Sequence, residues 1–299
     1  MESREKPLDA EASVALPESP KERRVLPGEP GQQGDEVLAR RRVVVGKRSA
    51  PMVETAEGLR PLSVIGDDER SRILATELTP YRMICALKIK APWGGFIGTG
   101  WFVDRRTIIT AGHCVYDRSQ MGGWADEIEV TPAQDANERP FGTFTATRFF
   151  TVDEWLERRD PDFDIGAIRL DEPVDARIGA FSVAALPDAD LQDCLVNVSG
   201  YPGSPGGGGQ QWWAMNRIKA VTPRRIFYDV DTSGGQSGGP VYIYEDNDPD
   251  TPKVIGIHAY GIGGTPTSLR PLVVNSAPRL IPEVIEQIEA WRNAPDTGD

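Results

Sequence analysis

Residues 231–240 read Asp-Thr-Ser-Gly-Gly-Gln-Ser-Gly-Gly-Pro, and a strand-like run over 241–244 follows them directly. The glycines around Ser237 allow an unusual backbone and the close approach of a substrate. Successive peptide N–H groups in such a loop can converge on a developing oxyanion. This stretch therefore predicts a serine that a substrate can approach closely, although alone it also fits an ordinary glycine-rich turn.

Two further motifs supply partners for a serine nucleophile. The chain has only two histidines, and His113 follows a short β run in residues 110–114, Thr-Ala-Gly-His-Cys. Asp164 begins the apolar run 165–170, with Asp162 as its main competitor for a role beside an imidazole. Either residue alone fits a structural role. The order His, Asp, Ser, each in a suitable context, indicates nucleophilic catalysis.

The segment 235–239 also matches the Gly-x-Ser-x-Gly pattern of α/β-hydrolases. That elbow should open a helix, whereas residues 240–244 favour a strand. The α/β-hydrolase order also needs an acid and then a histidine after the serine, and His258 alone lies downstream, close by. We therefore reject this assignment.

Together these motifs resemble those of the chymotrypsin-fold (trypsin-like) serine proteases, and within them the bacterial glutamyl endopeptidases. The resemblance implies an all-β fold of two antiparallel β-barrels, with the active site between them and a C-terminal α-helix. It extends from about residue 63 to that helix. The matching stretches are 63–70 (SVIGDDER), 99–101 (TGW), 110–114 (TAGHC), 164–168 (DIGAI), 199–203 (SGYPG) and 231–240.

The resemblance implies a serine endopeptidase that works through an acyl-enzyme. Ser237 would attack the scissile carbonyl, His113 would act as general base and then acid, and Asp164 would orient the imidazole. The backbone N–H groups of Gly235 and Ser237 would form the oxyanion hole. A catalytically silent, protease-like binding module is the alternative from a different class.

The resemblance also bears on which peptide bond is cleaved. His258 and Thr232 match residues that contact the substrate carboxylate in glutamyl endopeptidases, so cleavage after Glu or Asp is expected. From the residues alone, His258 also fits a strand histidine satisfied by the core. Asp231 lies six residues before Ser237, where trypsin-type enzymes bind Arg or Lys. Cleavage after Arg or Lys through Asp231 therefore stays open.

Composition divides the chain into a leader, 1–62, and a protease domain, 63–299. The leader has no aromatic residue, dense charges of both signs and several prolines, which predicts disorder. Within the domain we expect a first barrel over about 63–185, a second over about 186–278 and an amphipathic helix over about 279–294. The leader is a candidate propeptide, because the resemblance suggests processing near Ser63 or Val64. A docking or inhibitory segment is the other possibility.

The net charge of −12 argues against nucleic acid as the main partner. No apolar run is long enough to cross a bilayer. We expect protein or peptide substrates, a monomer, and no cofactor or metal, because the three cysteines lack metal-ligand spacing. No cysteine lies near Gly98 to pair with Cys114. The absence of a visible signal peptide favours the cytoplasm, whereas the resemblance favours secretion.

Overall fold

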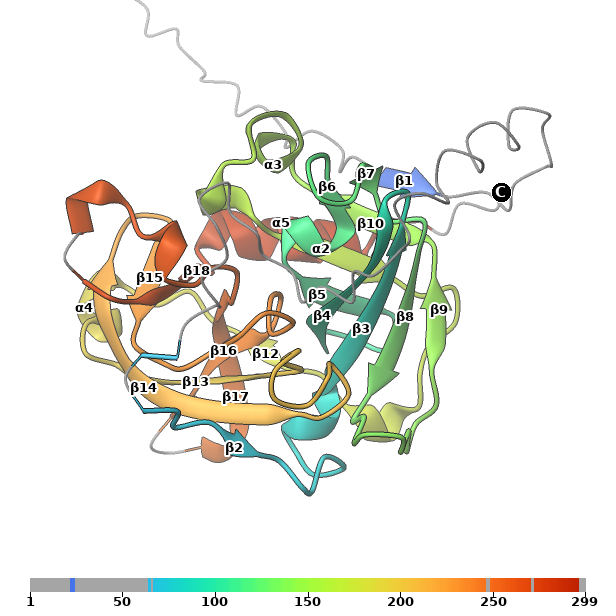
Figure 1. Cartoon of the computed structure of the whole chain (residues 1–299), viewed down its shortest axis with the longest axis horizontal. Coiled ribbons are helices and arrows are strands. Elements are labelled where there is room, and N and C mark those ends of the chain that lie inside the picture. The colour runs from blue at the N-terminus through green and yellow to red at the C-terminus, as the bar shows by residue number, and fades with distance from the viewer. Residues whose placement is uncertain (1–21, 25–63, 66, 246–247, 270–271, 296–299) are drawn as a thin grey trace, which may run out of the picture.

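The structure is a computed structural model that describes residues 22–24, 64–65, 67–245, 248–269 and 272–295. They form two eight-stranded, mainly antiparallel sheets, which curve into the two expected barrels and lie side by side (Figure 1). A separate pair, β6 (Tyr116–Asp117) and β7 (Gly123–Trp124), lies outside both sheets. The short strands and frequent turns are typical of a chain rich in glycine and proline.

The first sheet contains most of the chain's early strands. One of its connections is the turn after Phe102, where the Asp104 carboxylate accepts N–H bonds of 2.7 Å from both Arg106 and Thr107. This Asx-type turn joins two neighbouring antiparallel strands of the sheet as a hairpin. In spatial order the strands are β1 (Glu22–Arg24), β10 (Arg148–Thr151), β11 (Gly166–Arg169), β5 (Thr107–Thr110), β4 (Gly94–Phe102), β3 (Ile84–Ala91), β8 (Glu127–Pro132) and β9 (Phe144–Ala146).

The second sheet also includes two short strands from the region expected to form the first barrel. These are β2 (Ser71–Arg72), which pairs with β14, and β12 (Ser182–Val183), which pairs in parallel with β17. The chain therefore crosses between the sheets at both ends of the first barrel. The remaining strands are, in spatial order, β17 (Asp248–Ile257), β16 (Pro240–Glu245), β13 (Leu195–Gly200), β14 (Trp212–Val221), β15 (Arg225–Tyr228) and β18 (Asn275–Pro278).

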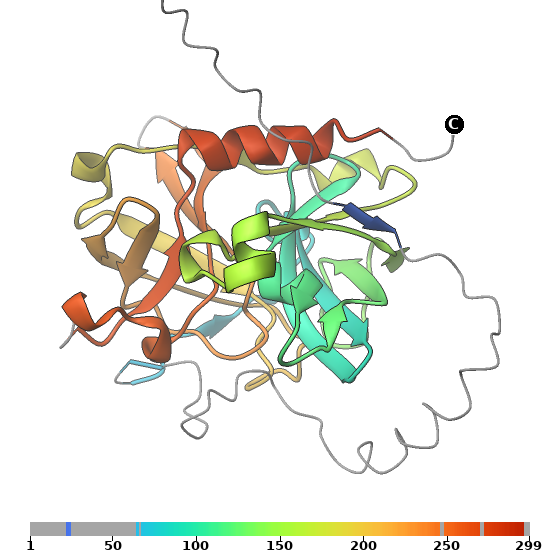
Figure 2. The same ribbon diagram turned by 90° about the horizontal axis from the view of Figure 1, so that it is seen from above.

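The expected C-terminal helix is present as α5 (Pro282–Arg292), which lies along one side of the molecule (Figure 2). Val284, Ile288 and Trp291 are its buried residues, and the Trp291 ring stacks on Phe150 of β10. This is the apolar face that the sequence predicts. The other α-helices are short: α2 (Gly112–Val115), α3 (Asp153–Arg158) and α4 (Asp188–Leu191). None of the helices in the described residues could span a membrane.

Three residues of the expected leader form strand β1, which pairs antiparallel with β10 in the register Arg23 to Phe149. Adding a strand to a sheet edge needs only backbone hydrogen bonds, so it does not require the aromatic residues that the leader lacks. The rest of 1–62 lies outside the described residues.

Candidate active site

His113 and Asp164 meet because their strands are neighbours. β5 and β11 pair antiparallel with Thr110 opposite Gly166, so the residues just after β5 and just before β11 lie together. Asp164 Oδ1 accepts the backbone N–H of His113 at 2.8 Å, and Asp164 Oδ2 lies 2.8 Å from His113 Nδ1. The two contacts hold the imidazole in one orientation.

The environment of this pair favours a charged imidazole. Burial alone would lower the pKa of His113, but the neighbouring Asp164 carboxylate raises it well above its ordinary value. Asp162, the competing acid, is half-exposed and faces Arg225 at 4.0 Å. The structure therefore brings Asp164, and not Asp162, against the histidine.

Ser237 lies in the loop before β16, and the first sheet holds this loop through Thr99 of β4. The Thr99 N–H donates to the Ser237 carbonyl and its hydroxyl donates to the Gly235 carbonyl, both at 2.8 Å. At Gly238, with φ at +86°, a Cβ would lie 2.1 Å from Thr110 Oγ1. Only glycine fits there, so the tight turn carries Ser237 to the junction of the two barrels.

The candidate nucleophile and base atoms, Ser237 Oγ and His113 Nε2, are buried. Within the described residues, neither Ser237 Oγ nor His113 Nε2 makes a hydrogen bond. The backbone N–H groups of Gly235 and Ser237 also donate to no protein group in this part of the chain. Both N–H groups can therefore donate to a bound acceptor or a developing anion.

His258 and Thr232, the expected specificity residues, each have a buried polar atom without a hydrogen-bond partner among the described residues. His258 follows β17, and its backbone bonds to Gly238 and Gly239 fix it beside the Ser237 loop. Its Nδ1 contacts the Tyr228 hydroxyl at 2.7 Å, while His258 Nε2 and Thr232 Oγ1 are buried without a hydrogen-bond partner among the described residues. Burial lowers the pKa of His258 to about 3, and the nearby His113 adds to this effect, so the ring is neutral at pH 7.

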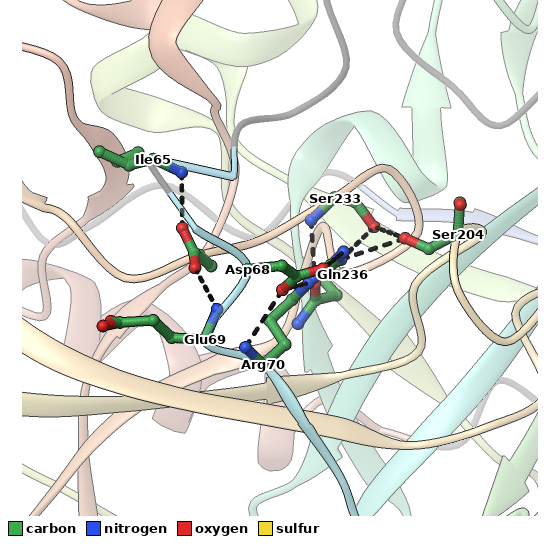
Figure 3. Close-up of polar contacts among 8 residues, drawn as sticks. Ile65, Asp68, Glu69, Arg70, Ser204, Ser233 and Gln236 are labelled. Atoms are coloured by element: carbon green, nitrogen blue, oxygen red, sulfur yellow. Dashed lines mark hydrogen bonds and ion pairs between the residues drawn. The ribbon is translucent and has the colours of Figure 1, made fainter.

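Asp231 instead contacts the chain segment that carries Ile65 and Glu69, which are drawn in Figure 3. Its Oδ1 accepts the N–H of Ile65 at 2.6 Å, and its Oδ2 accepts the N–H of Glu69 at 2.8 Å. Both carboxylate oxygens are thus occupied by backbone donors of the segment that enters the domain.

Arg70 ties the same segment to the serine loop (Figure 3). Its Nη1 donates to Ser233 Oγ at 2.8 Å and to the Ser204 carbonyl at 3.1 Å, while Asp68 holds the other side of the guanidinium. Inside the loop, Gln236 Oε1 accepts the Ser233 N–H at 2.9 Å. An uncharged Gln236 therefore stabilises the loop by a local hydrogen bond.

The sequence did not reveal Tyr228 or Arg70 as site residues. Tyr228 is thirty positions from His258. Arg70 is 163 positions from Ser233. No local motif links either pair, because they meet only when the second barrel closes.

The described residues contain neither a disulfide nor a candidate metal site. All three cysteines are free, and Cys114 Sγ lies only 3.0 Å from where a Cβ on Gly98 would be. Among the described residues, no group of three or more His, Cys, Asp or Glu side chains could hold a metal ion. A cavity of about 450 Å³ lies beside the serine loop, between Ile97, Gly203 and the charged pair Lys88 and Glu129.

Sequence comparison identifies relatives across most of the chain. A family model described as a trypsin-like peptidase domain matches residues 98–257. A protein of Bacillus subtilis named extracellular metalloprotease is 34% identical over 238 residues, which cover 79% of this chain and 71% of that protein. A glutamyl endopeptidase of Bacillus licheniformis is 32% identical over 234 residues, which cover 78% of this chain and 70% of that enzyme.

The fold comparison agrees with this. A solved structure of a Glu endopeptidase in complex with MPD superposes with a TM-score of 0.65, over 78% of this chain and 100% of that one. Because the sequences are only 23% identical, this match bears on the fold alone.

Proposed function

Because this chain belongs to the trypsin-like peptidase family and is a serine-type endopeptidase, we propose that Ser237, His113 and Asp164 are its catalytic triad and that it cleaves after glutamate or aspartate. The observation that carries the proposal is the His113–Asp164 pair, joined by two contacts of 2.8 Å, with Ser237 Oγ and His113 Nε2 buried and unpartnered within the described residues.

In the proposed reaction, Ser237 Oγ attacks the carbonyl carbon and its proton moves to His113 Nε2. The C–N bond then breaks, and His113 returns the proton to the leaving amine. Water hydrolyses the resulting ester by the same sequence of proton transfers. Asp164 fixes the tautomer of the imidazole and stabilises its cation. The reacting atoms come into hydrogen-bond reach when substrate is bound, because such contacts are often long in free enzymes.

The negative charge on the carbonyl oxygen would be stabilised by the N–H groups of Gly235 and Ser237. Their lack of acceptors in the described chain supports this role. A donor of this kind contributes about 3 kcal/mol to the transition state. Gly235 has φ at +99°, and a Cβ there would lie 2.5 Å from the Tyr201 carbonyl, so no other residue could present its N–H in the same way.

The preference for an acidic side chain rests on the donors of His258 and Thr232. The atoms concerned, His258 Nε2 and Thr232 Oγ1, are buried, and neither atom has a hydrogen-bond partner among the described residues. A substrate carboxylate can accept from an imidazole N–H and a hydroxyl at once, and hydrogen bonds to an ionised acceptor are the strong ones.

Cleavage after Arg or Lys is the second candidate, and the contacts of Asp231 weigh against it. A substrate cation would have to displace the N–H groups of Ile65 and Glu69 from its two oxygens. Binding of the cation would then leave two backbone N–H groups without acceptors, which weakens binding. A pocket whose aspartate has no such backbone partners would not incur this cost.

The proposal includes a role for residues 1–62 as a leader removed near Ser63.

Protein beginning at Ser63 and the full-length chain would be treated side by side with a fluorophosphonate probe, and the labelled peptide identified by mass spectrometry. We expect the label on Ser237, and much slower labelling in His113→Ala. Label on a different residue would contradict the triad. Absence of label on both proteins would contradict it and favour the silent binding module.

A further inference from the structure

Tyr228 and His258 form a buried polar pair behind the serine loop. Tyr228 is the last residue of β15, and His258 follows the last residue of β17. The hydroxyl and the imidazole Nδ1 are 2.7 Å apart, and both side chains are fully buried. The triad mechanism does not use this contact.

The direction of this hydrogen bond can be worked out from its surroundings. Within the described residues, Nδ1 of His258 is the hydrogen-bond partner recorded for the Tyr228 hydroxyl. A buried hydroxyl proton needs an acceptor, so Tyr228 donates and Nδ1 accepts. A neutral imidazole that accepts at Nδ1 carries its proton on Nε2.

The proton on Nε2 has no acceptor of its own in the described chain, and neither has the hydroxyl of Thr232. A buried donor left unpaired costs folding free energy, which a bound acceptor recovers. The backbone of His258 is bonded to Gly238 and Gly239, so this donor belongs to the site around Ser237.

We propose that Tyr228 is a positioning residue for specificity: its hydroxyl holds His258 in the tautomer whose Nε2–H donates to the substrate carboxylate. The proposal rests on the cleavage after acidic residues proposed above. It makes recognition depend on a neutral donor rather than on an imidazolium. It also predicts discrimination against glutamine, whose neutral amide oxygen accepts a weaker hydrogen bond from Nε2–H than the glutamate carboxylate does.

The first test compares kcat/KM for two peptides that differ only in Glu or Gln before the scissile bond. In Tyr228→Phe we expect the Glu-to-Gln ratio to fall at least ~10-fold, mainly through KM for the Glu peptide. The matched control is Tyr242→Phe, which removes a buried hydroxyl bonded to Ser199 Oγ at 3.1 Å. The control should keep the wild-type ratio.

The second test reads the tautomer directly by ¹⁵N NMR of histidine-labelled protein without an affinity tag. The chain has two histidines, so a His113→Gln variant leaves His258 as the one labelled ring. We expect the Nε2–H tautomer, replaced by a mixture in Tyr228→Phe. If that variant fails to fold, the tautomer of the Tyr228 protein still decides.

The outcomes separate the two proposals. A wild-type enzyme that prefers Glu, with an unchanged ratio in Tyr228→Phe or with the Nδ1–H tautomer, would overturn the role of Tyr228 alone. A wild-type enzyme with no preference for Glu would overturn the proposed specificity and this inference with it.

Discussion

Asp231 gives the sharpest test of how the site is built, because its two readings predict opposite results. In our account its carboxylate anchors the chain segment that contains Ile65 and Glu69, through N–H bonds of 2.6 and 2.8 Å. In the trypsin-like alternative it binds a substrate cation. The substitution Asp231→Asn keeps the size of the side chain and removes its charge.

The expected effect follows from these two bonds. Asparagine keeps one acceptor oxygen and places an NH₂ against the other backbone N–H, so one charge-assisted bond is lost. Such a bond contributes about 1.5–3 kcal/mol. Amide exchange at Ile65 or Glu69 should therefore be faster by about 10- to 150-fold.

Hydrogen exchange followed by mass spectrometry, on peptides that cover residues 64–70, measures this change. A Ser237→Ala background prevents self-digestion. The control is Asp229→Asn, which removes a charge two residues away whose carboxylate instead contacts Lys219 Nζ at 3.0 Å. The anchoring role would be refuted by two results together. Exchange would be unchanged by Asp231→Asn in this background, and the same substitution in the Ser237 enzyme would abolish a cleavage after Arg or Lys that the wild type shows.

Three further predictions concern the triad, the fold and the pocket. The Asp164 carboxylate raises the pKa of His113 against the effect of burial, so kcat/KM should rise with pH through a value above 6.5. Asp164→Asn should move that limb of the pH profile to lower pH and cost about 10⁴-fold in rate; an unmoved limb would be contrary evidence. Gly98→Cys should form a disulfide with Cys114, since the new Cβ would lie 3.0 Å from its Sγ. The gain should be about 3 kcal/mol in a denaturant titration and vanish with reductant, and failure to cross-link would contradict the geometry. Thr232→Val should lower kcat/KM for a Glu peptide by about 10- to 150-fold and leave that for an Ala peptide unchanged; equal losses on both would deny the hydroxyl a role in recognition.

Burial alone did not decide which strands the sequence revealed, because β10 (Arg148–Thr151) and β18 (Asn275–Pro278) are buried throughout and were not predicted. β5 (Thr107–Thr110) and β16 (Pro240–Glu245) were predicted, from the β run before His113 and the strand-like run over 241–244. β14 (Trp212–Val221) was not predicted either, because the polar Asn216 interrupts the apolar residues on its less exposed face and a register shift interrupts its pairing with β15. Periodicity gives little signal in such a strand.

The candidate site contains residues that local sequence motifs reveal and residues whose contacts depend on distant parts of the chain. His113, Asp164 and Ser237 lie in compact motifs, so their chemistry could be predicted before any distance was known. The direction of the Asp231 side chain could not, because it depends on backbone donors 166 and 162 positions away. The partner of His258 likewise depends on the closure of the second barrel.

The central claim is a Ser237-dependent endopeptidase that reads an acidic side chain. Its most direct test is a peptide-library digest with protein that starts at Ser63, with Ser237→Ala as the blank and cleavage sites read by mass spectrometry. The account predicts new ends after Glu or Asp, and none in the blank. Cleavage after Arg or Lys, or the same products with Ser237→Ala, would contradict it.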